Sequence, residues 1–393
     1  MGTSQSIEAV ADRILPEIVR IRHSIHENPE IALRERDTSA LIRQALKETR
    51  VRLLEPFMET DVVGILDGKG SGKNVTLRAD IDALPLEEET GLPYRSKRRG
   101  LMHACGHDGH AAMLVGAALA LDRLEDRFDG SVRFVFQPGE EVEAAGKELV
   151  EKGALLDPAP DAVLALHAWS GMPEGAIASK PGAIMAAADF FRITVKGKGC
   201  HASMPEASID PILTAARIIE ALQSIASRRV SALDPVVVSV CRVSGGTNSN
   251  IIPDTVELEG TTRYLDAAIG KKLPRQIERI VKGICDAAGA SYELGYVSKY
   301  IPTINDPNVV AVGRRVAKDA LGPGKWIELD RPAMGGEDFS YYITDHPGAM
   351  FRLGMGEAAA ALHSPRFDFN DNALRPGIVF LISAALELLS NRD

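Results

Sequence analysis

The sequence has 393 residues, of which 45% are hydrophobic and 25% charged, and its formal net charge at pH 7 is −9. This length exceeds one ordinary hydrophobic core, so we expect two domains in a globular protein of ordinary composition. The negative charge argues against nucleic acid as a partner, and we find no apolar stretch of the roughly 20 residues that cross a bilayer, so no membrane role is expected.

The chain opens on an amphipathic helix, expected at residues 7–26, and this segment has no secretory pattern. The four cysteines, at 105, 200, 241 and 285, have neither zinc-finger nor oxidoreductase spacing. We therefore expect reduced thiols and a cytoplasmic location.

Strands and a helix alternate in the next part of the chain. Residues 74–79, 131–136 and 162–166 are expected to be strands, and residues 109–124 have the length and the Ala and Leu content of a buried helix. This alternation predicts an open α/β sheet with helices on both faces.

Polar residues follow the ends of these strands: Asp80 and Asp82 after the first, Glu140 and Glu141 after the second, and His167 after the third. Ligands bind at this edge of open α/β sheets. Cys105 and His107 directly precede the predicted helix, and we expect the helix dipole to favour the thiolate of Cys105.

The pattern changes near residue 187. Strands are expected at 190–195, 236–240, 255–262 and 291–297, and helices at 211–228 and 273–288. This order predicts an α+β sandwich at residues 187–299. It is expected to interrupt an α/β domain made of residues 1–186 and 300–393. The reason is that His363 lies beyond the insertion but is expected at the same site as the polar residues that precede it.

A thiol, several imidazoles and paired carboxylates are the donors that a divalent metal prefers. Residues 102–110 contain Cys105 and three histidines, and Glu140, Glu141, His167 and His363 follow. This collection indicates a metal-dependent hydrolase.

The order of these motifs resembles that of the M20 metallopeptidase family. The resemblance runs from residue 22 to the last helix, and it is carried by residues 102–108, 140–141, 199–203, 248–253 and 335–339 and by His363. It is strongest to the amidohydrolase branch, which includes hippurate hydrolases, auxin-conjugate hydrolases and N-acyl-amino-acid deacylases.

The resemblance implies two divalent metal ions per subunit. The implied ligands are Cys105, His107, Glu141, His167 and His363, and a thiolate can bridge two ions. Zn²⁺, Mn²⁺, Co²⁺ and Ni²⁺ all remain open. Many relatives outside this branch have a His-x-Asp ligand motif where this chain has Asp80-Ile81-Asp82, so we expect His107 to replace that ligand and the two aspartates to orient ligands.

Glu140 is the expected general base. Adjacent glutamates in a turn point in different directions, so Glu141 can bind metal while Glu140 faces a water molecule. A carboxylate in that position can take a proton from the water and pass it to the leaving amine.

Residues of the inserted domain are implied to bind substrate. In relatives, the histidine that matches His201 reaches the active site of a neighbouring subunit, and Asn250 and Arg263 match lid residues that hold the carbonyl and carboxylate of the substrate. The turn at Gly335 and Gly336 is expected to present backbone N–H groups to the same end of the substrate. The inserted domain would then be a lid and dimerisation domain of a homodimer or higher homo-oligomer.

The expected reaction is hydrolysis of the amide bond of an N-acyl amino acid, a small-molecule substrate, to a carboxylic acid and a free amino acid. A metallocarboxypeptidase or dipeptidase acting on short peptides is the alternative enzyme. A non-catalytic protein that binds amino acids or metal is a more distant alternative. The sequence identifies neither the acyl group nor the amino acid.

Overall fold

The computed structural model describes residues 6–124 and 128–390, which form two compact units. The first unit consists of Met1–Ile184, Thr303–Arg331 and Asp338–Asp393. The second consists of Met185–Pro302 and Pro332–Glu337. The predicted boundaries at 187 and 299 differ slightly from these, and the sequence did not indicate that residues 332–337 belong to the second unit.

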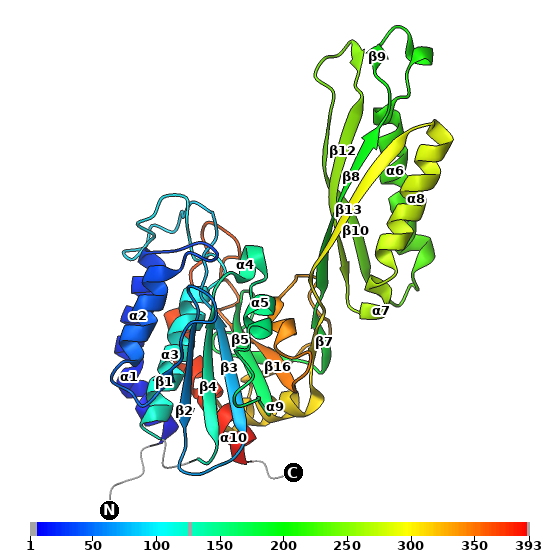
Figure 1. Cartoon of the computed structure of the whole chain (residues 1–393). Coiled ribbons are helices and arrows are strands. Elements are labelled where there is room, and N and C mark those ends of the chain that lie inside the picture. Colours follow the sequence, from blue (N-terminus) through cyan, green and yellow to red (C-terminus); the bar gives the residue numbers. More distant parts are fainter. Residues whose placement is uncertain (1–5, 125–127, 391–393) are drawn as a thin grey trace, which may run out of the picture. The chain divides into compact units, whose positions relative to one another are not determined.

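The first unit is built on a mixed sheet of eight strands in the order β1-β2-β4-β3-β5-β16-β6-β15 (Figure 1). The strands are β1 (Arg52–Leu53), β2 (Val62–Asp67), β3 (Asn74–Asp80), β4 (Ser131–Gln137), β5 (Ala162–Trp169), β6 (Ile177–Ser179), β15 (Trp326–Glu328) and β16 (Gly348–Gly354). A separate pair joins β7 (Gly182–Met185) to β14 (Thr303–Asn305). The α/β fold class predicted from the sequence is confirmed.

The three predicted strands are neighbours at the centre of this sheet. β3 runs parallel to β4 on one side and to β5 on the other, and β5 runs parallel to β16. Every residue of β3 and β4 is buried, as expected for parallel strands that are covered on both faces. The carboxyl ends of β3, β4 and β5 therefore meet at one edge, where the polar residues follow.

Helices cover both faces of the sheet. On one face, the hydrophobic core joins the strands to four helices that pack against one another: α1 (Ile7–Glu27), α3 (His107–Asp122), α9 (Pro307–Ala320) and α10 (Leu374–Ser390). Figure 1 shows α2 (Arg36–Leu46) beside α1 and α3. On the other face, α5 (Gly146–Glu151) packs against the 3-10 helix Asp338–Tyr341. Asp338 is hydrogen-bonded there to Arg78 of β3 and Gln137 of β4.

The last helix corrects one expectation. Residues Asp371–Ser390 are long and apolar enough to cross a membrane by length and composition, although we had found no such stretch. Leu374, Ile378 and Phe380 are buried, and α10 packs against α1, α3 and α9. A core helix passes the same test of length and composition, and these contacts explain its apolar sequence.

The second unit is an antiparallel four-stranded sheet in the order β10-β12-β8-β13, with two helices packed on it. The elements are β8 (Ala187–Lys196), β10 (Val236–Gly245), β12 (Thr255–Tyr264), β13 (Ser291–Tyr300), α6 (Pro211–Leu222) and α8 (Leu273–Ala288). Buried and more exposed residues alternate along β12, because only one face of the sheet carries helices. The short strands β9 (Cys200–His201) and β11 (Ile251–Ile252) pair with each other.

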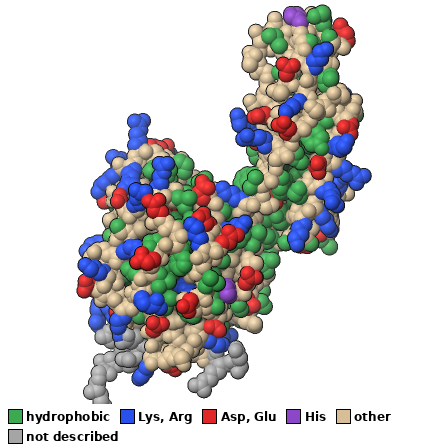
Figure 2. All heavy atoms as spheres, viewed as in Figure 1, with side chains coloured by type: hydrophobic (Ala, Val, Ile, Leu, Met, Phe, Trp, Pro, Cys, Tyr) green, Lys and Arg blue, Asp and Glu red, His purple; other side chains and the backbone are tan. Residues whose placement is uncertain are grey.

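Charged side chains of both signs are interspersed on the face of the molecule displayed in Figure 2.

Candidate metal centre and residues of the second unit

A glycine brings Cys105 and His107 to the edge of the sheet. Gly106 has φ +88° and directly precedes α3, which begins at His107 itself rather than at residue 109 as predicted. A Cβ atom on Gly106 would lie 3.0 Å from the Cβ atom of Ala168 in β5. The absence of a side chain therefore lets this turn pack directly beside the end of the strand that carries His167.

Cys105 lies between two of the predicted histidine ligands. Its Sγ atom is 3.6 Å from Nε2 of His167 and 3.3 Å from Nε2 of His363. His363 has φ +63°, an unfavourable backbone conformation for a residue with a side chain, and its amide donates to the carbonyl of Ala104 at 2.8 Å. Strain of this kind persists where the surrounding structure holds a residue in place, often at functional sites.

Glu141 lies between His363 and His107, the last of the five predicted ligands. Its Oε1 atom lies 3.1 Å from Nε2 of His363 and 3.8 Å from Nε2 of His107. The Nε2 atom of His107 is buried and has no hydrogen-bond partner among the residues that the structure describes. All five predicted ligands therefore converge, although they come from four separate segments of the chain.

Hydrogen bonds at the opposite ring nitrogens orient two of these histidines. Nδ1 of His107 is 3.1 Å from Oδ1 of Asp82, and Nδ1 of His167 is 2.7 Å from the carbonyl oxygen of Ala168. In the neutral form of each ring, Nδ1 is the donor to its oxygen, which leaves the lone pair on Nε2, on the side of the other predicted ligands.

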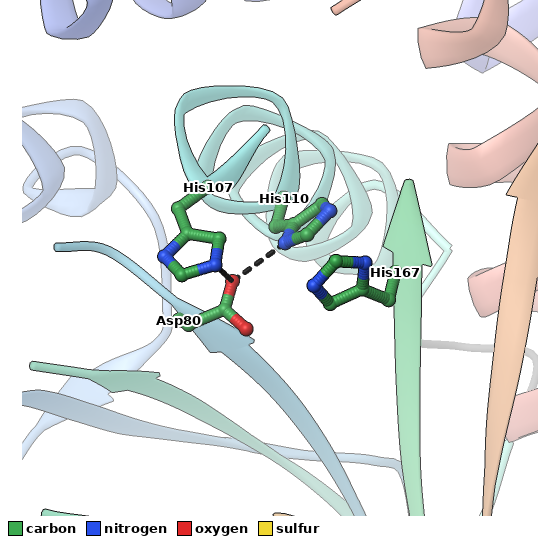
Figure 3. A group of neighbouring side chains, drawn as sticks. All are labelled: Asp80, His107, His110 and His167. Atoms are coloured by element: carbon green, nitrogen blue, oxygen red, sulfur yellow. Dashed lines mark hydrogen bonds and ion pairs between the residues drawn. The ribbon is translucent and has the colours of Figure 1, made fainter. Parts of the chain in front are cut away.

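Figure 3 shows Asp80, His107, His110 and His167 as one buried group. His110 differs from the other two histidines, because both of its ring nitrogens are already used. Nδ1 lies 2.5 Å from Oδ1 of Asp80, and Nε2 accepts a hydrogen bond from the amide of Ala168 at 2.8 Å. His110 therefore ties the end of β5 to Asp80, and it retains no lone pair for a metal.

The surroundings of this group are acidic. Burial by itself lowers the pKa of His107, but Asp80, Asp82 and Glu141 outweigh it and raise that pKa to about 10. Burial lowers the pKa of His167 to about 3. Carboxylates thus stabilise the protonated form of one buried imidazole, and the imidazole beside it is neutral. Such an environment favours a bound cation.

The protein groups around Cys105 favour its protonated thiol and not the expected thiolate. Burial, followed by the charges of Glu141, Glu140 and Asp80, raises the pKa of this thiol well above its usual value. The dipole of α3 favours the thiolate, but the low polarity of the interior and the nearby carboxylates oppose it and outweigh it.

Glu140 lies at the same edge of the sheet. It is the first residue of α4 (Glu140–Glu143), just after β4, and it is buried. Asp82 accepts a hydrogen bond from the amide of the next residue, Glu141, at 3.0 Å. Asp82 thus contacts two predicted ligands, which agrees with the orienting role expected of it.

His201 and Asn250 lie together in the second unit. The amide of Ala202 donates to the carbonyl of Asn250 at 2.9 Å, and the pairing of β9 with β11 continues this contact. His201 is exposed, and its Nδ1 atom lies 2.7 Å from Oγ of Ser203.

Arg263, Gly335 and Gly336 lie at the other end of the same unit. Arg263 pairs with Ala188 in the sheet, and a Cβ atom on Gly336 would lie 3.0 Å from the Cβ atom of Ala188. The start of β12, near His201, is eight residues from Arg263, about 26 Å along a strand. The structure therefore groups Arg263 with the two glycines and places Asn250 at the opposite end of the unit.

Some residues that support the site were missed. Arg78, in the middle of β3, contacts Asp80 at 2.8 Å and Asp338 at 2.7 Å, and Asp338 also accepts from the amide of Gly146 at 2.8 Å. An arginine within a strand expected to be buried was the available signal, because a buried guanidinium requires carboxylate partners.

The chain is similar to known proteins over most of its length. Residues 76–387 match the model of peptidase family M20/M25/M40. The chain is 36% identical to an N-acetyl-L-cysteine deacetylase of Bacillus subtilis, over 96% of this chain and 89% of that protein. It is 39% identical to thermostable carboxypeptidase 1 of Saccharolobus solfataricus, over 92% of each chain.

A solved structure agrees with the fold. The crystal structure of the Bacillus subtilis YXEP protein, described as a dinuclear metal binding peptidase, has a TM-score of 0.85 and 32% sequence identity to this chain. The likeness covers 97% of this chain and 99% of that one.

Proposed function

The chain belongs to peptidase family M20/M25/M40, and we propose that it hydrolyses the amide bond of N-acyl amino acids, releasing a carboxylic acid and a free amino acid. The similarity to an N-acetyl-L-cysteine deacetylase supports this substrate class. The observation that carries the proposal is the convergence of a thiol, three imidazoles and a carboxylate beside a second, buried carboxylate.

The donor set fits divalent metal ions. Nε2 of His107 is buried and has no hydrogen-bond partner within the described residues, Nε2 of His167 is an acceptor, and acidic groups lie near both. We propose two ions per subunit, held by the set Cys105, His107, Glu141, His167 and His363, and of the class Zn²⁺, Mn²⁺, Co²⁺ or Ni²⁺. When bound, such ions would polarise the scissile carbonyl and make a water molecule more acidic.

Glu140 is the proposed general base. It is held beside the ligand Glu141 and its charge reaches Cys105, so it can accept a proton from the attacking water. The same carboxyl group can then donate that proton to the nitrogen of the leaving amino acid.

Two copies of the chain are proposed to complete each site. Because His201 with Asn250 lies at one end of the second unit and Arg263 with Gly335 and Gly336 at the other, one copy cannot present both groups to a single small substrate. We propose that Arg263 and the two glycines bind the carboxylate end of the substrate and that a partner supplies His201 and Asn250 to the scissile carbonyl.

Exposed apolar side chains around His201 support a homodimer. Met204, Ile212, Leu213, Val243 and Ile251 are each about half exposed, and a Cβ atom on Gly246, one residue beyond β10, would lie 4.0 Å from Ile212. Apolar side chains that gather on a surface typically mark an interface between proteins.

The four cysteines are free within the described chain, which supports the proposed cytoplasmic location.

A peptidase acting on short peptides is the second candidate, and the identity to a carboxypeptidase favours it. The same clamp for a carboxylate would serve a peptide. A non-catalytic binding protein would have no need of a buried Glu140 beside complete ligands, so this alternative is the weakest.

The test is hydrolysis by protein stripped of metal and reloaded with Mn²⁺, Zn²⁺, Co²⁺ or Ni²⁺. The substrates are N-acetyl, N-benzoyl and N-indoleacetyl amino acids together with dipeptides, and stripped protein is the control. We expect metal-dependent release of amino acid from one N-acyl class. Cleavage of the dipeptides alone would favour the peptidase, and binding of metal without any turnover would favour the binding protein.

A further inference from the structure

Buried carboxylates from distant segments hold the turn that carries Glu140. This turn, residues 137–146, connects β4 to α5. Asp338 accepts hydrogen bonds from Nε2 of Gln137 at 2.7 Å and from the amide of Gly146 at 2.8 Å, at the two ends of the turn. In the middle of the turn, Asp82 accepts a hydrogen bond from the amide of Glu141.

Glu35 holds the same turn at the residue before Glu140. Its Oε1 atom accepts hydrogen bonds from the amides of Gly139 and Leu33, each at 3.0 Å. Its Oε2 atom accepts from the hydroxyl of Thr60 at 2.8 Å. The side chain is fully buried, and it lies between α1 and α2, outside the residues that match the family model.

The backbone at this contact is confined. Gly139 has φ +65°, and a Cβ atom there would lie 3.1 Å from the side chains of both Ala145 and Leu33. Leu33 itself has φ +61°, which a leucine rarely adopts. Two residues with left-handed backbone thus donate their amides to one carboxylate oxygen. Glu35 thereby holds Leu33 in a conformation that is unfavourable for a leucine, and it fixes the place of Gly139, which adopts this conformation freely.

Burial and the nearby charge of Asp82 raise the pKa of Glu35 to about 7. A carboxyl group placed where its charge is disfavoured costs stability. The compensating gain that the structure shows is the placement of Gly139, and through it of the first residue of α4.

We propose that Glu35 is a positioning residue that sets the direction of the Glu140 carboxylate by holding the amide of Gly139. It touches no substrate. The inference rests on the proposed role of Glu140 as general base. Asp82 holds Glu141 independently, so loss of Glu35 should disturb the base more than the metal ligand.

Glu30 provides a matched control. It is also buried, and it also accepts hydrogen bonds from two amides and a threonine hydroxyl, those of Asp37 and Thr38. Those amides belong to the first turn of α2, so Glu30 caps a helix, and its side-chain hydrogen bonds within the described chain go to α2 and not to residues 137–146.

The experiment compares metal-loaded Glu35→Ala, Glu35→Gln and Glu30→Ala. The measurements are kcat and KM on the best N-acyl substrate, bound metal, and amide hydrogen exchange in peptides covering residues 137–146. We expect Glu35→Ala to lower kcat by about 10–100-fold and to speed exchange in the turn, with KM and metal content within about twofold. Glu35→Gln should restore both, because its amide oxygen can accept the same two N–H groups, and Glu30→Ala should change neither.

Equal kcat in Glu35→Ala and Glu30→Ala, or unchanged exchange in the turn, would overturn the inference. Should Glu35→Ala fail to fold, Glu35→Met keeps the length of the side chain without an acceptor. The double variant with Glu140→Gln separates the two proposals, because Glu35→Ala should cost less than about twofold once the base is gone. If Glu140→Gln alone keeps full activity, both proposals are wrong; if it is inactive while Glu35→Ala behaves as Glu30→Ala, only this inference is wrong.

Discussion

The carboxylate of Asp82 lies 3.1 Å from Nδ1 of His107, and this contact determines which nitrogen of His107 faces the other ligands. Its second oxygen accepts a hydrogen bond from the amide of Glu141 at 3.0 Å. One buried carboxylate, two residues beyond the end of β3, thereby orients two predicted metal ligands that come from α3 and α4.

Asp82→Asn should weaken metal binding by about 10–100-fold, because an amide offers one acceptor oxygen where the carboxylate serves two donors. Titration of stripped protein against a competing chelator measures the affinity. Asp67→Asn, an exposed residue at the end of β2, is the control. Unchanged affinity in Asp82→Asn would contradict the orienting role.

Glu140→Gln should lower kcat by about 10²–10⁴-fold with metal content intact, because glutamine cannot take the proton from the attacking water. Glu143→Gln, an exposed residue at the end of the same short helix, should keep its rate. Steady-state kinetics on metal-loaded protein decide the matter, and a Glu140→Gln variant of wild-type rate would show that the base lies elsewhere.

His26 should make stability depend on pH. Its Nδ1 atom lies 2.8 Å from Asp108 and its Nε2 atom 3.4 Å from Glu88. Although burial and Arg22 lower the pKa of His26, the charge of Asp108 and the hydrogen bonds to both carboxylates raise it from 6.5 to about 9.

Because the folded-state pKa is the higher one, the stabilisation is complete below about pH 6.5 and is lost as the pH rises through 9. We expect the difference in unfolding free energy between wild type and His26→Gln to shrink by on the order of 2 kcal/mol from about pH 6 to about pH 10. Thermal unfolding across this range measures it, with His346→Gln as a control. A difference that is constant with pH would show that His26 is not protonated in the folded protein.

Mixing two inactive variants should restore activity if a partner completes each site. His201→Ala lacks the group supplied to the partner, and Glu140→Gln lacks the base. After subunit exchange, half of the dimers carry one complete site, which corresponds to about one quarter of the wild-type rate. No recovery despite demonstrated exchange would contradict the shared site.

Much of the fold was predictable from local pattern. Apolar runs bounded by turn residues located β3, β4 and β5, and their alternation with α3 indicated the α/β sheet. Local pattern did not reveal residues 332–337 as part of the second unit, because that association depends on contacts such as the hydrogen bond from the amide of Ala186 to Gly335. Nor did it anticipate that α3 begins at His107, since the conformation of Gly106 depends on its packing against Ala168.

The sequence by itself determined the chemistry available: a thiol, histidines and carboxylates placed at the ends of strands, in an order that resembles one enzyme family. Only the tertiary structure decided what each group can do. His110 is excluded as a ligand because Asp80 and the amide of Ala168 take both of its nitrogens, and His107 remains available because Asp82 takes only one. Hydrogen bonds between residues far apart in the chain set these roles, and their directions exist only once the strands and helices have packed together.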